Sequence, residues 1–142
     1  IRRILVQCNS FVKIMNKIGT SPMLLQEFIA TSSGRDIRIN IVGGKPVACM
    51  YRYSENDDFR ANITNGAKMK SYAPNEQQVK MAVETCKILN LDFAGVDILF
   101  GKNEEPILCE VNSNAHFKNI YDCTKVDVAD HIFKYIKIEM EK

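Results

Sequence analysis

The sequence predicts an α+β domain: two layers, with an antiparallel sheet and helices on one face of it. Residues 36–53 and 95–112 each show the strand–turn–strand pattern of a β-hairpin. Residues 74–89 and 124–138 place apolar side chains at the spacing of amphipathic helices. Helices beside antiparallel hairpins are typical of this class, and 142 residues suffice for one core, so we expect a single domain over residues 1–142.

Ahead of the first hairpin, the pattern changes from helix to strand. Apolar residues at helical spacing predict a helix over residues 9–18, which Gly19 ends. The apolar run at residues 23–29 predicts a short strand, and Thr, Ser and Gly at residues 31–34 indicate a turn.

The first hairpin has the clearest alternation in the chain. Residues 36–42 alternate isoleucines with polar side chains, a tight turn at residues 43–45 follows, and residues 46–53 return as the second strand.

Alternation places Asp36, Arg38 and Asn40 on one face of this hairpin. That face is either a solvated surface with a local ion pair or a polar wall that meets phosphates or ribose hydroxyls. The forked guanidinium of arginine suits anionic oxygens. Arg52 belongs to the partner strand, and the tyrosines beside it leave its side open.

Residues 54–66 are polar and aperiodic, which predicts an exposed loop. Arg60 and Asn62 lie inside it. They are either solvent-exposed loop residues without a function or residues that enter the site when the loop covers a bound substrate. A short strand follows, with Lys68 and Lys70 on its solvent side.

Two helices flank the second hairpin. One opens at Pro74, a residue that suits the first turn of a helix, and continues to residue 89. The last begins near Thr124, which forms a pair of the capping-box type with Asp127, and runs through Ile138.

The second hairpin carries the most informative residues. If its turn folds about Asn103 and Glu104, Asp97 lies opposite Glu110, with Cβ atoms about 4.5–5.5 Å apart. Alternation puts Asn112 on the same side. Two carboxylates and an amide oxygen suit Mg²⁺ or Mn²⁺, which bind substrate phosphates in their remaining positions. The alternative is the solvated face of an ordinary hairpin.

The bulk composition excludes several classes of protein. Nineteen basic and 17 acidic residues give a net charge of +2, which is too balanced for a nucleic-acid-binding footprint. No apolar run approaches the roughly 20 residues of a membrane span, and the first residues do not resemble a signal peptide.

The five cysteines are widely spaced and odd in number, which indicates reduced thiols and a cytoplasmic location. A zinc site from Cys109, His116 and Cys123 is the alternative, although its spacing matches no common pattern.

Five ordered segments resemble the ATP-grasp superfamily and, within it, the RimK-type carboxylate–amine ligases, which add glutamate to a ribosomal protein. They are residues 25–29, 34–38, 58–62, 94–98 and 110–112. The resemblance runs from about Leu24 to Ile132 and implies the C-terminal lobe of an ATP-grasp fold.

The resemblance also implies roles for residues, with ATP and Mg²⁺ (or Mn²⁺) as cofactors. The nucleotide-binding set is Gln26, Glu27, Phe28, Asp36, Arg60 and Asn62. The cation-binding set is Asp97, Glu110 and Asn112. The catalytic set is Arg38 and Arg60. Arg38 and Arg52 would orient the acid substrate or the developing phosphate charge.

The implied partners are ATP, a carboxylate substrate and an amine acceptor such as an amino acid. The carboxylate attacks the γ-phosphate to give an acyl phosphate and ADP, and the amine then displaces phosphate to form an amide. Positioning and charge neutralisation carry such phosphoryl transfer. We expect Asp97→Asn or Glu110→Gln to abolish turnover and to leave the fold intact, or even to stabilise it by removing like charges.

Two departures accompany the resemblance. Where the family usually has a Ser-Pro-Gly loop, residues 113–118 read Ser-Asn-Ala-His-Phe-Lys. The lysines and glycine-rich loop of the superfamily's preceding subdomain have no counterpart. We therefore expect a C-terminal piece of a larger ligase, inactive without its N-terminal part. The alternatives are a non-catalytic nucleotide-binding or regulatory module of the same shape, and an ordinary interaction domain.

Overall fold

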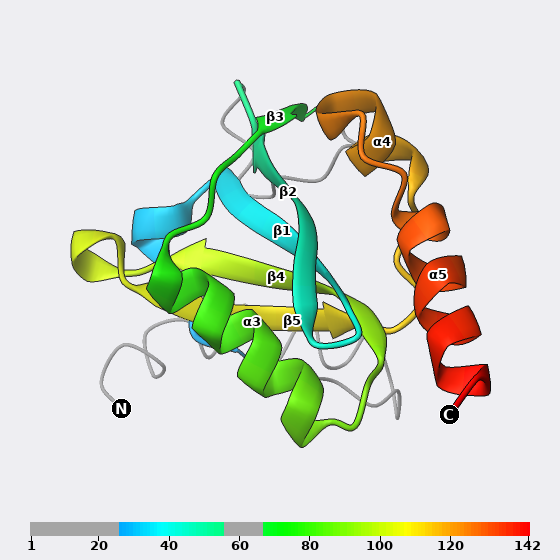
Figure 1. The fold of residues 1–142 in the computed structure, drawn as a ribbon. Helices are drawn as coiled ribbons and strands as arrows, with labels where there is room; N and C mark the ends of the chain where they lie inside the picture. Colours follow the sequence, from blue (N-terminus) through cyan, green and yellow to red (C-terminus); the bar gives the residue numbers. More distant parts are fainter. Residues whose placement is uncertain (1–25, 56–66) are drawn as a thin grey trace, which may run out of the picture.

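The computed structural model describes residues 26–55 and 67–142, which form a five-stranded antiparallel sheet with helices (Figure 1). The strand order is β3-β2-β1-β4-β5. The strands are β1 (Arg35–Val42), β2 (Lys45–Tyr53), β3 (Lys68–Ser71), β4 (Phe93–Phe100) and β5 (Pro106–Asn112). The helices are η1 (Ala30–Ser32), α3 (Glu76–Ile88), η3 (Lys102–Glu104), α4 (Lys118–Thr124) and α5 (Val128–Met140). The predicted α+β class is confirmed.

Several predictions concern residues outside the described ranges. These are the helix at residues 9–18, the first part of the strand at residues 23–29, and Arg60 and Asn62. The described end of that predicted strand, residues 26–29, has no regular structure, so this part of the prediction is wrong.

The β1–β2 hairpin forms as predicted because its turn has two adjacent glycines. Gly43 and Gly44 have φ values of +55° and +72°. A two-residue turn with positive φ at both positions matches the twist of the flanking strands, and glycine adopts it without a steric penalty.

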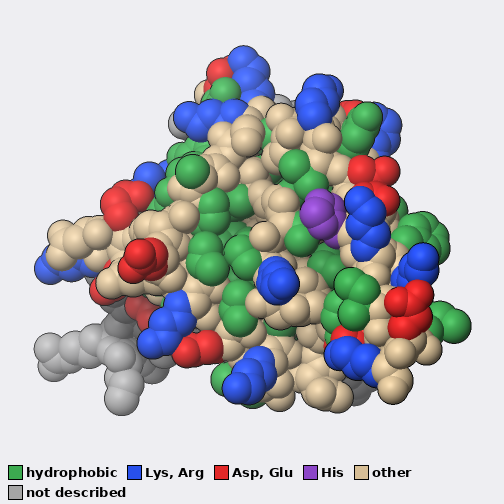
Figure 2. Space-filling model, in the orientation of Figure 1, with side chains coloured by type: hydrophobic (Ala, Val, Ile, Leu, Met, Phe, Trp, Pro, Cys, Tyr) green, Lys and Arg blue, Asp and Glu red, His purple; other side chains and the backbone are tan. Residues whose placement is uncertain are grey.

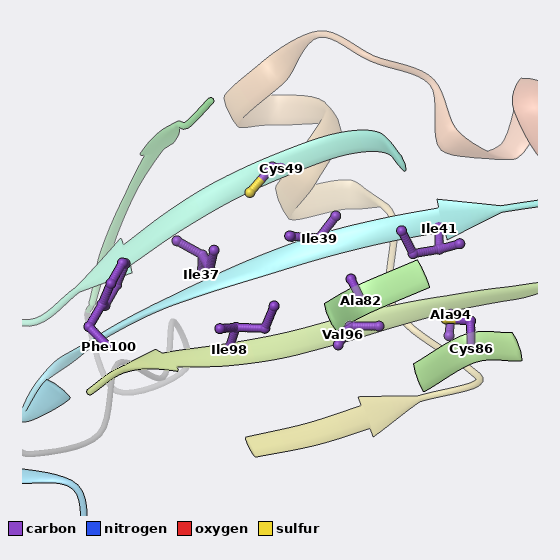
Figure 3. Packing of buried hydrophobic residues seen from close by; sticks show 10 residues of the cluster. All are labelled: Ile37, Ile39, Ile41, Cys49, Ala82, Cys86, Ala94, Val96, Ile98 and Phe100. Carbon is purple, nitrogen blue, oxygen red and sulfur yellow. The ribbon is translucent and has the colours of Figure 1, made fainter. Parts of the chain in front are cut away.

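One face of the sheet packs against α3 and holds the main core (Figure 3). Ile37, Ile39 and Ile41 of β1 are fully buried there beside Val96 and Ile98 of β4, and α3 contributes Ala82 and Cys86. The period of two along β1 and β4 therefore supplies an apolar layer on this face and leaves the intervening side chains to the other face.

The opposite face is also covered at one end, which corrects the expectation of helices on one face only. Met50 lies directly opposite Arg38 in the β1–β2 register, so the two side chains share a face. Met50 and Val42 pack there against Ile120 of α4 and Val128 of α5. Helices thus lie on both faces, and the polar side chains of Asp36, Arg38 and Asp97 share the second face with Met50.

The helix boundaries depend on capping residues that apolar periodicity alone did not reveal. Asn75 caps α3, accepting a hydrogen bond from the Gln78 backbone N–H while the Gln78 side chain accepts from the Asn75 N–H. The predicted last helix corresponds to α5, which begins four residues later than expected and is capped by Asp127. The preceding helix α4 was not predicted, and Lys125, with φ +61°, ends it. Thr124 is therefore the end of α4 and not the start of the last helix.

Acidic and basic side chains are interspersed on the surface seen from the side of α3 (Figure 2). Among residues 26–55 and 67–142, no helix has the length and apolar character needed to cross a bilayer.

Candidate functional site

A β-bulge decides which side chains of β5 share a face with Asp97. Near the turn, Ile98 pairs with Leu108. The register then shifts, so that Cys109 has no partner of its own and Asp97 pairs with Glu110. Without the extra residue, Asp97 would lie opposite Cys109 and Glu110 would point to the α3 face. The predicted pairing of Asp97 with Glu110 is confirmed, and the bulge is its cause.

Asp97 is buried beneath a forked arginine contact from β1. Arg38 lies opposite Asp97 in the β1–β4 register. Its Nε donates to Oδ1 at 2.6 Å and its Nη2 donates to Oδ2 at 2.7 Å. The Asp97 side chain is only 6% exposed and that of Arg38 is 16% exposed. This paired geometry fixes both the carboxylate plane and the guanidinium plane.

Arg52 belongs to the same face, which settles the side that alternation left open. It lies opposite Asp36 and donates to both of its oxygens at 2.7 Å. Its Nη2 also lies 3.0 Å from Asp97 Oδ2. Because Arg52 is 8% exposed, the interpretation of this face as a solvated surface is wrong for these residues.

Burial and charge oppose each other in the pair of Asp36 and Arg52. Burial raises the pKa of Asp36, against the attraction of the Arg52 guanidinium. Burial alone would lower the pKa of Arg52, but hydrogen bonds and charges from Asp36 and Asp97 outweigh it, and the net pKa is raised. Arg52 therefore remains a fixed positive charge beneath the face.

Glu110 and Asn112 complete the cluster at its exposed edge. In the amide orientation that satisfies both neighbours, Asn112 donates to Glu110 Oε1 at 2.9 Å and accepts from Arg38 Nη2 at 3.2 Å. A continuous set of contacts thus joins Asp97, Arg38, Asn112 and Glu110. The three predicted cation ligands are gathered on one face of the β4–β5 hairpin.

The donor set fits a hard divalent cation better than a zinc ion. Within the described ranges, no three His, Cys, Asp or Glu side chains are grouped to hold a metal ion, so Cys109, His116 and Cys123 form no such site. A cation beside Asp97 and Glu110 would take its third protein oxygen from Asn112, and an all-oxygen set of this type suits Mg²⁺ or Mn²⁺. Counting only residues that the structure describes, the carboxylates of Asp36, Asp97 and Glu110 exceed the guanidinium groups of Arg38 and Arg52 by one negative charge, which favours a cation.

Gly95 is a residue of this face that the sequence interpretation missed. A Cβ at Gly95 would lie 2.8 Å from Ala115 Cβ and 3.3 Å from Arg38 Cδ. The loop after β5 therefore rests directly on the sheet beside the stem of Arg38. A glycine inside a strand often marks such a close approach, and this was the available signal.

Three of the predicted nucleotide-binding residues lie outside this cluster. Gln26, Glu27 and Phe28 are exposed, in the irregular segment before η1, and Phe28 is 60% exposed. Of the remaining nucleotide-binding predictions, only Asp36 belongs to the described cluster.

Comparison with known families gives a match over nearly the whole chain. Residues 4–136 match the RimK-like ATP-grasp domain. Two relatives bear the name probable alpha-L-glutamate ligase. The one from Maridesulfovibrio salexigens is 40% identical over 115 residues, and the one from Syntrophotalea carbinolica is 43% identical over 115 residues. Each match covers 81% of this chain and 38% of the relative, so the chain spans about two fifths of their length.

Two solved ligases share the fold of this chain. A D-alanine–D-alanine ligase from Bacillus anthracis, complexed with ATP, gives a TM-score of 0.62 at 14% identity and covers 94% of this chain and 48% of its own. The ligase PsnB, complexed with a phosphomimetic variant of its minimal precursor, Mg and ADP, gives 0.59 at 17% identity, with 78% and 34% covered. At these identities the likeness concerns the fold alone.

Proposed function

Because the chain belongs to the RimK-like ATP-grasp family, we propose that residues 1–142 form the C-terminal part of an ATP-dependent carboxylate–amine ligase. The observation that carries the proposal is the face on which Asp97, Glu110 and Asn112 meet beside two buried arginines. On an ordinary solvated hairpin face, arginine side chains would be exposed, whereas those of Arg38 and Arg52 are only 16% and 10% exposed.

In the proposed phosphoryl transfer, one group of residues on this face binds the cation and another orients the substrate. Asp97, Glu110 and Asn112 would hold Mg²⁺ or Mn²⁺, which when bound neutralises charge on the β- and γ-phosphates of ATP. Arg38 and Arg52 orient the acid substrate and balance the charge that develops on the transferred phosphoryl group. The substrate carboxylate then attacks the γ-phosphate to give an acyl phosphate and ADP, and the amine displaces phosphate to form the amide.

The nucleotide-binding residues of the proposal extend beyond this face. Glu27 and Phe28 would line the adenine site, with Gln26 beside them in the nucleotide-binding set, and all three side chains are exposed. Asp36 would contact the nucleotide next to Arg52, which holds its carboxylate in place. Arg60 and Asn62 would approach the phosphates.

The relatives suggest the class of substrate. Because they are named glutamate ligases, we propose that an amino acid such as glutamate is joined to a protein or small-molecule acceptor. We also propose a cytoplasmic location, which the free thiols of Cys49, Cys86, Cys109 and Cys123 support.

Metal-dependent formation of ADP tests the activity. The complete gene product is incubated with MgATP, glutamate and candidate acceptors, and ADP, phosphate and product mass are measured. We expect ADP formation that requires both cation and acceptor, and a loss of that activity in Glu110→Gln with an unchanged melting temperature. Absence of nucleotide binding would refute the proposal, and nucleotide binding without ADP formation would favour a non-catalytic module. A glycine-rich loop flanked by lysines, encoded upstream of Ile1, would support the assignment as a C-terminal part.

A further inference from the structure

Most of the coordination capacity of Asp97 is already used by arginines. A carboxylate offers about four lone-pair sites on its two oxygens. Arg38 Nε takes one site on Oδ1, while Arg38 Nη2 and Arg52 Nη2 converge on Oδ2. Glu110, in contrast, has no Lys or Arg partner within residues 26–55 and 67–142, and its carboxylate accepts a hydrogen bond from the Asn112 amide.

We infer that Arg38 and the divalent cation compete for the oxygens of Asp97, so that cation binding releases the Arg38 guanidinium toward an anionic group of the substrate. This inference rests on the proposed function, because it takes Asp97 as a cation ligand. It adds that Arg38 occupies the cation's place until the cation arrives.

The contacts indicate that Arg38, and not Arg52, is the group that moves. Arg52 holds both oxygens of Asp36 and keeps that partner if its single contact with Asp97 is lost. Arg38 makes its only carboxylate contacts, among the described residues, with Asp97. Its side chain is also the more exposed of the two, 16% against 10%.

A released Arg38 would need a new anion, because a partly buried guanidinium without one is costly. The Asn112 amide oxygen, 3.2 Å from Nη2, carries no net charge. The forked donors of Arg38 match a carboxylate or a phosphate, the two anionic groups of the proposed substrates. Cation and anion should therefore bind cooperatively, each raising the affinity for the other by the same factor.

Substituting Arg38 by lysine distinguishes two explanations for weak cation binding. Arg38 could occupy the Asp97 oxygens, or its positive charge could simply repel the cation. Binding of Mn²⁺ alone to the nucleotide-free chain is measured by electron paramagnetic resonance for wild type, Arg38→Lys and Arg38→Gln. Lysine keeps the charge and loses the fork, so competition predicts tighter Mn²⁺ binding in both variants, by about tenfold. Arg35→Gln, which breaks an exposed pair with Glu104, is the control and should leave Mn²⁺ affinity unchanged.

The Mn²⁺ affinities of the variants show whether the competition or the cation site itself is wrong. If Arg38→Gln binds Mn²⁺ more tightly and Arg38→Lys binds like wild type, charge repulsion explains the effect and competition is overturned. Equal affinity in all three proteins also overturns competition but leaves the cation site standing. If none binds Mn²⁺, the cation role of Asp97 fails as well. Melting temperatures verify that each variant is folded.

A second measurement uses the wild-type chain alone. The Nε–H signals of Arg38 and Arg52 are followed by nuclear magnetic resonance during a Mg²⁺ titration. We expect the Arg38 signal to shift and exchange faster with solvent, while the Arg52 signal is retained through Asp36. An Arg38 signal that stays unchanged at saturating Mg²⁺ would overturn the inference.

Discussion

Replacing Asp97 by Asn should destabilise the fold as well as remove a cation ligand. In the structure, the neighbours of Asp97 are two guanidinium groups, at 2.6–3.0 Å. The sequence-based expectation, that the fold stays intact or gains stability when like charges are removed, assumed a carboxylate as the main neighbour. The arginines reverse the expected sign.

The magnitude follows from what the substitution leaves behind. Removing one partner of a buried ion pair costs about 3–5 kcal/mol. Arg38 keeps some access to water, Arg52 keeps Asp36, and an Asn side chain still accepts one hydrogen bond. We therefore expect a loss of about 2–4 kcal/mol in the free energy of unfolding, which in a chain of this size lowers the melting temperature by about 10 °C.

Glu110→Gln is the matched control, because it removes the other carboxylate of the predicted cation site from an exposed position. We expect it to change stability by less than about 0.5 kcal/mol. Urea denaturation followed by circular dichroism measures both variants, and Mn²⁺ binding shows whether each has lost the cation.

A double-mutant cycle with Arg38→Gln then isolates the ion pair. Asp97→Asn should cost less in the Arg38→Gln background, by about 1–3 kcal/mol, because the fork is already gone. A stability loss in Asp97→Asn no larger than that in Glu110→Gln would refute the reasoning, since it would mean that the buried contacts contribute nothing.

Two further substitutions test contacts at the edges of the site and the fold. Gly95→Ala should destabilise the chain by about 1–3 kcal/mol, because its Cβ would meet Ala115 Cβ at 2.8 Å, and Ala115→Gly in the same chain should restore stability in urea denaturation. Tyr135 donates a 2.8 Å hydrogen bond to Asp92, and this bond, with smaller effects of burial and charge, raises the tyrosine pKa to about 12. Its stabilisation is therefore complete below the unfolded pKa of about 10 and is lost as the pH rises toward 12. The melting temperatures of wild type and Tyr135→Phe should converge over that range, and a constant difference would contradict the assignment.

Local sequence patterns were sufficient to predict the first hairpin, its core face and its turn. The isoleucines of β1 identified its core face, and Gly43 with Gly44 identified its turn. Helices were predicted less well at the end of the chain: α4 was missed, and α5 was expected to begin at Thr124, whereas Lys125 in the left-handed region ends α4 and Asp127 caps α5.

Burial of the polar face was beyond the reach of the sequence. Alternation places Asp36, Arg38 and Asp97 opposite the isoleucine face but does not say whether solvent reaches them. The adjacency of β1 and β4, strands separated by 50 residues, brings Arg38 over Asp97, and Arg52 of β2 lies against the same carboxylate. These long-range contacts convert a possible surface ion pair into a buried one.

The sequence by itself determined the two hairpins, the α+β class and the residue types that a cation and a phosphate require. Tertiary structure decided which of those residues meet. Near the turn, β4 and β5 pair in a register that would put Glu110 on the α3 face, and one extra residue, Cys109, shifts it to the face of Asp97. Because side chains alternate with a period of two, a shift of one residue moves every later side chain to the other face. Sequence alternation alone does not reveal where that shift occurs.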